Sequence, residues 1–328
     1  MNLGKMLAGT AVILLSAACG LVIVHHSITG EWPATPADLA FWHDDAVREG
    51  DETRRSWTFP MRDSATIVVD ATDADIQISP TDSAAATVEI WLAGMTTDPD
   101  NYASSVRMAD PGMLRVNAKA TESWQNWQEG HARIIVHVPR ATAITVTSIR
   151  GNTTIGEMKG RTIVQAYGGG IRLMAGEGPI DLQSNGGSVA VERHIGAGRI
   201  VAKKGTVMTN MMQGALTISA TGDIGVRRHF GRLTATSDGG AITADLLSAD
   251  STCTLTTHLG DISLRIPQDA QTTVDAFTSE GTIINQLSVG EHQGERVAGS
   301  WVQLLGGGGF PMILRSYRGT ITVGEYFE

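Results

Sequence analysis

Apolar and polar residues alternate along most of the chain, in short runs that recur about every eighteen residues. The runs Ile180-Asp181-Leu182 and Leu233-Thr234-Ala235 are examples, with an apolar residue at every second position. Such alternation is typical of a strand with one buried face. A glycine follows each run, and the second residue after that glycine is always β-branched. The glycines are Gly151, Gly169, Gly187, Gly205, Gly222, Gly240, Gly260, Gly281 and Gly319.

The intervals between these glycines predict a β-solenoid. Subtracting neighbouring positions gives 18, 18, 18, 17, 18, 20, 21 and 38 residues. One unit comprises a strand, a turn ending in glycine, a second strand and a looser third side. Units of this kind bury their apolar face only by stacking on one another. We therefore expect an all-β chain whose coils stack in chain order. A β-sandwich is the alternative, but its turns would not place the glycines in phase.

Two positions within each coil carry specific expectations. The glycine at the turn is expected to take a positive φ, a conformation in which a Cβ would clash. About seven residues further on, a third side chain is expected to point into the coil. The residues at this third position are Met158, Ile195, Met212, Phe230 and Leu247.

Residues 1–24 contain a long apolar run, which has no charge after Lys5. Nineteen helical residues, from position 6 to position 24, would span about 28 Å, close to one hydrocarbon core. A retained signal-anchor helix is favoured, with Lys5 holding the N-terminus in the cytoplasm and the remainder beyond the inner membrane. Two alternatives stay open. The segment around Cys19 is similar to a bacterial lipobox, which would make Cys19 a lipidation site, and a cleaved signal would release the chain.

The remaining chain divides into a linker and the solenoid. Residues 25–56 are charged and contain prolines, as expected for a linker. Residues 57–328 carry the β pattern, with Ala74 in the position that glycine holds elsewhere. Within the solenoid we expect irregular N-terminal coils with a cap, then regular coils, then an insertion that caps the C-terminal end together with the last coil. These parts are residues 57–140, 141–285 and 286–328.

The net charge of −9 is spread unevenly. Residues 159–232 hold ten basic and four acidic residues, an excess of six positive charges in an otherwise acidic chain. Such a region could attract an anionic lipid, a glycan or an envelope protein, although surface charges also serve simply to keep a rod soluble. Few aromatic residues and an export signal do not fit a nucleic-acid partner. The residues expected in the anionic-partner patch are Arg193, Lys203, Lys204, Arg227 and Arg228.

The sequence contains few residues that suggest catalysis. It has no zinc-protease, paired-cysteine or nucleophile-elbow motif, so no catalytic, metal or cofactor-binding residue is predicted. Asp223 and Asp261 follow the glycine in coils two apart, about 10 Å, close to the span of an inverting glycosidase pair. Aspartate is also common after a turn glycine. Cys19 and Cys253 are not expected to form a disulfide.

The chain resembles a bacterial family in its repeated Gly-Asp-Ile, at Gly222-Asp223-Ile224 and Gly260-Asp261-Ile262, and in Val138-Pro139 before the first regular coil. This is the "putative adhesin" domain of unknown function. The resemblance extends over roughly residues 57–325. It implies a right-handed β-helix on an exported protein and supplies no catalytic residues.

Three functional hypotheses remain. The first is a non-catalytic, membrane-anchored envelope β-helix that acts as an adhesin-like binding or scaffold module, with the solenoid in the periplasm or outside the cell. The second is an envelope-stress sensor or accessory that binds anionic lipid or peptide. The third is a polysaccharide-acting β-helix enzyme. The oligomeric state does not follow from the sequence.

Overall fold

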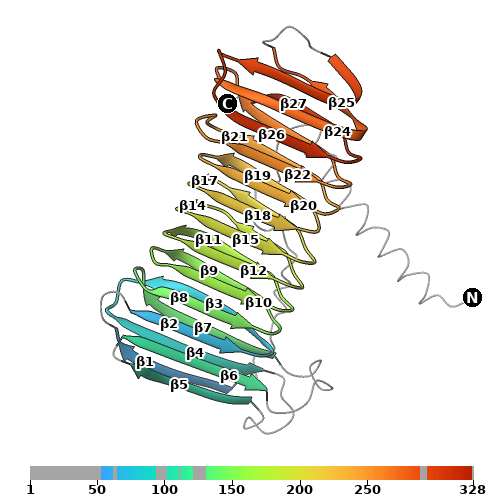
Figure 1. Cartoon of the computed structure of the whole chain (residues 1–328). Helices are drawn as coiled ribbons and strands as arrows, with labels where there is room; N and C mark the ends of the chain where they lie inside the picture. The colour runs from blue at the N-terminus through green and yellow to red at the C-terminus, as the bar shows by residue number, and fades with distance from the viewer. Residues whose placement is uncertain are drawn as a thin grey trace, which may run out of the picture. The chain divides into compact units, whose positions relative to one another are not determined.

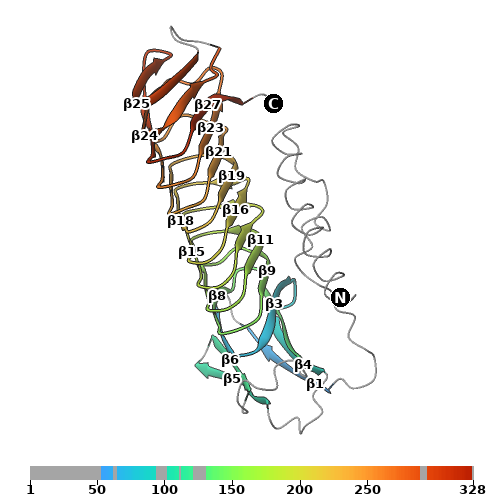
Figure 2. The same cartoon turned by 90° about the vertical axis from the view of Figure 1, so that its right-hand side faces the viewer.

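The computed structural model describes residues 53–61, 65–93, 102–110, 112–120, 131–288 and 294–326. Within these residues every regular element is a β-strand, and all strands join one continuous hydrogen-bonded sheet. The sheet winds into stacked coils, as Figure 1 and Figure 2 show. The prediction of an all-β solenoid is confirmed.

Each regular coil contributes one strand to the first face and one or two strands to the second face. Neighbouring coils pair in parallel, without slippage over most of the stack. The first face contains β2 (Thr66–Ala71), β8 (Ala143–Ser148), β10 (Thr162–Ala166), β12 (Ile180–Ser184), β15 (Gly198–Ala202), β18 (Leu216–Ala220), β20 (Leu233–Ser237), β22 (Cys253–Thr257) and β26 (Phe310–Ser316).

The second face contains β3 (Ala74–Thr81), β9 (Thr153–Met158), β11 (Ile171–Glu177), β13 (Val189–Val191), β14 (His194–Ile195), β16 (Val207–Asn210), β17 (Met212–Gln213), β19 (Ile224–His229), β21 (Ile242–Leu246), β23 (Ile262–Pro267) and β27 (Ile321–Tyr326). Ile171, Val189, Val207 and Ile224 are successive partners in one vertical file, which continues to Ile242. These side chains are buried, because every second residue of each strand points into the coil.

The glycines of the first corner, the turn between the two faces, are required for a different reason from the one predicted. Of these nine, only Gly151 has a positive φ, of 98°. The others are needed because successive coils approach too closely. A Cβ on Gly169 would lie 1.9 Å from the carbonyl oxygen of Gly151, and one on Gly240 would lie 2.2 Å from the carbonyl carbon of Gly222. Ala74 lies at the start of this file, as expected, with its oxygen 2.1 Å from a Cβ on Gly151.

Buried hydroxyl groups tie the first corners together. The Ser184 hydroxyl donates to the Gly169 oxygen at 2.8 Å and accepts from the Gly187 amide at 2.9 Å. Ser237 repeats this arrangement three coils further on. One hydroxyl therefore satisfies an amide of its own turn and a carbonyl of the neighbouring coil.

The third inward position was predicted one residue out of phase in part of the stack. Met158 and Met212 are buried as expected, but Ile195 and Phe230 are exposed. The buried residues in those coils are His194 and His229, one place earlier. The inward residue of these coils lies seven positions after the corner glycine, as Met158 and Met212 do, whereas Ile195 and Phe230 lie eight positions after Gly187 and Gly222. Leu247 is likewise displaced from the interior by Leu246.

Both ends of the stack break the chain order. At the C-terminal end, β24 (Thr272–Asn285) does not lie next to β22. The later strand β26 is inserted between them, and β25 (Gly294–Leu305) pairs antiparallel with β24 as the outermost strand. The prediction that coils stack in chain order is therefore wrong here.

The N-terminal end has the same design. The coil of β2 and β3 pairs directly with β8 and β9. Later strands add to its outer edge. These outer strands are β6 (Met113–Ala120) and β7 (His131–Pro139), followed by antiparallel β5 (Tyr102–Asp110), β4 (Ala85–Ala93) and β1 (Thr53–Pro60).

The predicted signal-anchor of residues 1–24, with Cys19, and nearly all of the linker lie outside the described residues. Among the residues that are described, none belongs to a helix long and apolar enough to span a membrane.

Candidate binding surface

The second corner, where each strand of the second face ends, is formed by a second file of glycines. Gly178, Gly196, Gly214 and Gly231 have φ values of 106°, 141°, 129° and 111°. A Cβ on Gly196 would lie 2.3 Å from the Gly178 oxygen. Here positive φ and close approach both exclude a side chain. Sequence reasoning missed this file, although its spacing of 18, 18 and 17 residues is visible in the chain.

Three apolar side chains are exposed beside this glycine file. Ile195, Met211 and Phe230 are 49%, 45% and 44% exposed. Ile195 pairs with Gln213, and Gln213 bridges to Phe230, so they occupy successive coils. Met211 and Arg228 both take a positive φ of 51°, which turns their side chains out of the strand. We call the surface formed by Arg193, Ile195, Met211, Arg228 and Phe230 the corner strip.

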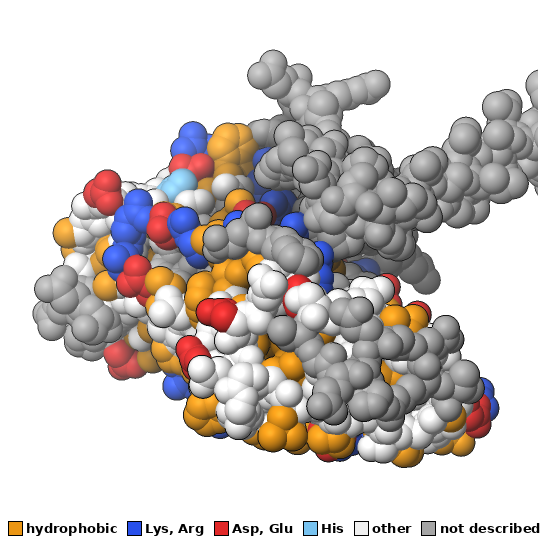
Figure 3. All heavy atoms as spheres, turned by 90° about the horizontal axis from the view of Figure 1, so that it is seen from above, with side chains coloured by type: hydrophobic (Ala, Val, Ile, Leu, Met, Phe, Trp, Pro, Cys, Tyr) orange, Lys and Arg blue, Asp and Glu red, His pale blue; other side chains and the backbone are white. Residues whose placement is uncertain are grey.

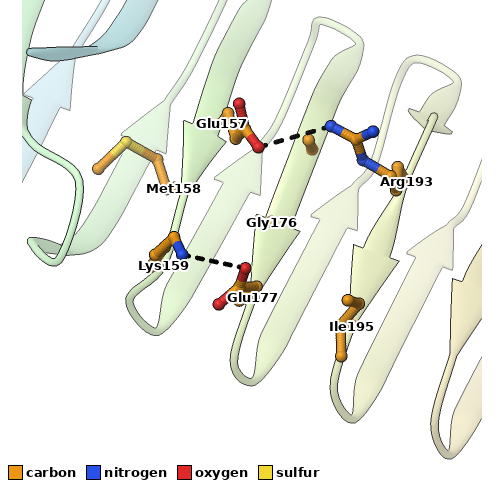
Figure 4. Close-up of a pocket in the computed structure, with 8 residues that line it drawn as sticks. Glu157, Met158, Lys159, Gly176, Glu177, Arg193 and Ile195 are labelled. Carbon is orange, nitrogen blue, oxygen red and sulfur yellow. Dashed lines mark hydrogen bonds and ion pairs between the residues drawn. The ribbon is translucent and has the colours of Figure 1, made fainter.

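A small hollow lies at the edge of the corner strip (Figure 4). Its volume is about 30 Å³, room for about one water molecule. Two ion pairs cross it: Lys159 Nζ lies 3.2 Å from Glu177 Oε1 in the neighbouring coil, and Arg193 Nη2 lies 3.5 Å from Glu157 Oε1 two coils away. All four side chains are about half exposed. The hollow is therefore a charged surface feature, too small to enclose a substrate.

The predicted anionic-partner patch is divided between the two corners. Arg193, Arg227 and Arg228 lie at the second corner, with the Arg228 Nε donating to Asn210 Oδ1 at 3.2 Å. Lys203 and Lys204 are exposed at the first corner, before β16. The four residues of β16 separate the groups by about 13 Å. Any one compact anion would contact only one group, whereas an extended surface would reach both.

Ion pairs already engage four of the ten basic residues between positions 159 and 232. Besides the two pairs across the hollow, Arg172 pairs with Glu192, and Arg199 Nη1 lies 3.1 Å from Asp181 Oδ1. Exposed pairs of this kind contribute little to stability. The positive excess therefore resides mainly in the two lysines of the first corner and in Arg161, Arg228 and Arg232.

Two histidines lie inside the coils directly behind the corner strip. His194 pairs in register with Gly176 and Met212, and both His194 and His229 are fully buried. Burial lowers the pKa of both imidazoles. They are therefore neutral core residues at neutral pH and are not accessible to a partner.

The carboxylates proposed for glycan chemistry hold coils together. Asp223 Oδ1 accepts the Ala241 amide at 2.8 Å, and Asp261 Oδ1 accepts the Thr320 amide at 2.7 Å. Asn152 Oδ1 accepts the Gly170 amide in the same position. An amide side chain thus performs the same task, so the contact itself does not depend on carboxylate chemistry.

The described part of the chain contains no candidate metal-binding group, and its cysteine is buried. No group of three His, Cys, Asp or Glu side chains there could hold a metal ion. Cys253 is buried on β22, and burial raises the pKa of its thiol to about 12. It is therefore a packing residue rather than a reactive one.

Comparison with known proteins gives a family and a fold. The family model described as Toastrack DUF4097 matches residues 65–323. Among proteins of curated function, none matches this chain.

Several solved structures are similar. One titled a putative adhesin from Parabacteroides distasonis is 13% identical over 84% of this chain and 97% of its own, with a TM-score of 0.43. Another putative adhesin, from Parabacteroides merdae, is 15% identical over 85% and 98%, with a TM-score of 0.41. A structure titled a putative lipid binding protein, also from Parabacteroides distasonis, is 12% identical over 85% and 98%, with a TM-score of 0.33.

Proposed function

This chain belongs to the Toastrack DUF4097 family, and from that premise we propose that it is a non-catalytic envelope β-solenoid that acts as an adhesin-like binding or scaffold module. The proposal includes the right-handed sense of the coil, retention of residues 1–24 as a membrane anchor, and a location of the solenoid beyond the inner membrane. The apolar run after Lys5 supports the anchor.

The observation that carries the proposal is the repetition of surface chemistry. Parallel pairing in register places Thr217, Thr234 and Thr254 in one outward file of the first face. Ser219, Thr236 and Thr256 form a second file beside it. The spacing between neighbours in a file is about 4.8 Å. Identical polar groups repeated over several coils suit an extended partner, such as a polymer chain or a surface, better than a small molecule.

The test is binding of the full-length chain, solubilised in detergent and immobilised, to envelope polymers: peptidoglycan, lipopolysaccharide and neutral glycans. We expect saturable binding to at least one polymer without any change in its length. Replacing Thr234 and Thr254 by Lys should weaken that binding, whereas replacing Asp250, exposed but outside the two files, should not. Cleavage of the polymer, or absence of binding to all of them, would contradict the proposal.

The corner strip favours a second function, binding of anionic lipid. Apolar Ile195, Met211 and Phe230 lie beside Arg193 and Arg228, a combination that suits a headgroup region where acyl chains and phosphates meet. Vesicles containing phosphatidylglycerol should therefore bind the chain more strongly than phosphatidylcholine vesicles. Arg193→Glu with Arg228→Glu tests the second corner, and Lys203→Glu with Lys204→Glu tests the first. If neither pair reduces vesicle binding, the electrostatic version fails.

The polysaccharide-acting alternative is tested by Asp223→Asn and Asp261→Asn. Because Asn152 makes the same contact in its own coil, both variants should fold. Loss of glycan cleavage in them would then report chemistry rather than stability. If the unmodified chain cleaves none of a panel of glycans, this alternative is wrong.

A further inference from the structure

The outermost strand at the C-terminal end, β25, has one unpaired edge within the described residues. Its residues Gly299–Leu305 pair antiparallel with Thr272–Thr278 of β24, and no other described strand pairs with β25. Figure 1 shows β25 beyond β24 at the end of the stack. Such an edge presents a row of backbone amides and carbonyls that can accept another strand.

The outer surface next to this edge is apolar. Val302 and Leu304 of β25 are 57% and 64% exposed. The register of β25, β24 and β26 places Leu304 in a row with Thr273 and Pro311, and Val302 in a row with Asp275 and Ile313. Exposed Phe277 lies in the next row, beside Arg315.

The charges within this surface neutralise each other. Arg315 Nη2 lies 2.6 Å from Asp275 Oδ2, and Arg315 Nη1 also donates to the Asp275 carbonyl at 2.7 Å. Seen from above, the lower side of the molecule in the picture carries mostly hydrophobic and uncharged side chains, with a few acidic ones among them (Figure 3). An apolar, charge-neutral surface along an open edge marks an interaction site rather than a solvated end.

Ala298–Leu305, the part of β25 that borders the apolar rows, contains no charged residue; Glu295 and Arg296 precede it. A strand that meets its own copy places each charge against an identical charge unless the pairing is displaced, so a neutral strand is suited to self-pairing. The opposite end of the stack differs. Its edge strands carry Arg54 on β1 and Arg107 and Asp110 on β5, all exposed, which protect an edge from pairing.

We propose that the chain forms a two-fold dimer in which β25 pairs antiparallel with β25 of a second copy, continuing the first face from one solenoid into the other. Val302 and Leu304 then lie beside the same residues of the copy, and the apolar rows of both chains become one covered surface. The charged N-terminal edges keep the contact closed at two copies, because head-to-tail addition would need β25 to pair with a guarded strand.

The test is sedimentation of the detergent-solubilised full-length chain, with the detergent contribution subtracted. We expect a protein mass of twice 34.7 kDa at micromolar concentration. Leu304→Lys and Val302→Lys should each shift the species to monomer or weaken the dimer at least tenfold. The matched control is Leu259→Lys, which charges a residue 56% exposed at the corner between β22 and β23, two coils away from β24, and should leave the dimer unchanged. Thermal unfolding should show that all three variants remain folded.

Single cysteines at Ser300, Val302 and Leu304, in a Cys19→Ser background, provide an independent measurement. Oxidation should give a covalent dimer at one or more of these positions and none at Leu259→Cys. A monomer at every concentration overturns the proposal, as does a dimer insensitive to both lysine substitutions. Monomers that bind neutral phosphatidylcholine vesicles through Leu304 would also overturn it, and would assign the surface to lipid instead.

Discussion

The two ends of the solenoid share one topology and differ in how their edges are protected. At each end one coil is inserted between the regular stack and a further parallel strand, and an antiparallel strand lies outside that strand. The N-terminal edges carry Arg54, Arg107 and Asp110, whereas Ala298–Leu305 of β25 is uncharged. Capping therefore solves two separate problems: covering the apolar interior, which both ends achieve, and protecting the exposed backbone edge, which charge achieves at only one end.

Different residues cover the apolar interior of the solenoid at its two ends. At the C-terminal end the large inward residue of β25 is Trp301, which is buried, as is Leu305 on the same strand. At the N-terminal end the buried aromatic residue of the edge strand is Tyr102 on β5. Partly buried Trp57 and Phe59 of β1 pack against the same interior. Substitutions at these positions test whether each end is held by its cap.

The largest effect is expected at Trp301. Trp301→Ala removes a buried side chain and should reduce the free energy of unfolding by about 3–5 kcal/mol. Urea unfolding followed by circular dichroism measures it. The control is Leu259→Ala, at a residue that is 56% exposed and lies outside β25, which should change stability by no more than about 0.5 kcal/mol. Equal effects of the two substitutions would show that β25 does not cover the interior.

The reversed coil order at the C-terminal end gives the next prediction. A Cβ on Gly319 would lie 1.8 Å from the carbonyl oxygen of Gly260, 59 residues earlier in the chain. Gly319→Ala should therefore cost about 3 kcal/mol through displacement of the backbone. In Gly239→Ala the new methyl meets its nearest atom at 3.6 Å and stability should hardly change. A harmless Gly319→Ala would refute the insertion of the last coil below β24.

The sequence predicts the coil but not its neighbours. The glycine spacing and alternating apolar residues identify the units, because each unit must meet the same packing condition at the corner. They do not say which unit stacks on which, since every coil offers the same hydrogen-bonding edge. This is why Gly281, earlier in the chain than Gly319, nevertheless lies beyond it in the stack.

The inward residue of the third side was predicted one position too late in some coils, and the reason is local. The apolar Ile195 and Phe230 attract a prediction of burial, but the inward residue of these coils is the histidine one place earlier, seven positions after the corner glycine. The basic patch failed to assemble for a related reason: nearness in sequence between Lys204 and Arg193 does not reveal that a strand-length face separates their corners.

The middle of the stack should differ from both ends in its response to acid. Burial lowers the pKa of His194 and His229, so the unfolded chain binds protons more readily than the folded chain below about pH 6.5. Stability should be constant above neutrality and fall as the pH decreases below 6.5, by at most about 1.4 kcal/mol per pH unit for each histidine.

Urea midpoints at pH 7.5 and pH 5.5 measure this effect. His194→Met, which copies Met158 and Met212 of the same file, should reduce the acid sensitivity, while His258→Ala, at an exposed site, should not. Hydrogen exchange at pH 5.5 should show protection lost first in residues 189–246, between the ends. Loss confined to β25 or to β1 would place the acid-sensitive region in a cap.

The smallest effect is expected at the N-terminal cap. The Tyr102 hydroxyl donates to the Thr72 oxygen at 3.1 Å. Burial, and then the charge of Asp73, raise the pKa of this phenol, so it remains a donor throughout the accessible pH range. Tyr102→Phe should leave one carbonyl without its donor and cost about 1 kcal/mol. Tyr167→Phe, at an exposed corner, should cost nothing measurable. If both substitutions are neutral, packing of the ring alone holds β5, and the N-terminal cap then resembles the C-terminal cap, where the buried Trp301 supplies surface rather than a defined hydrogen bond.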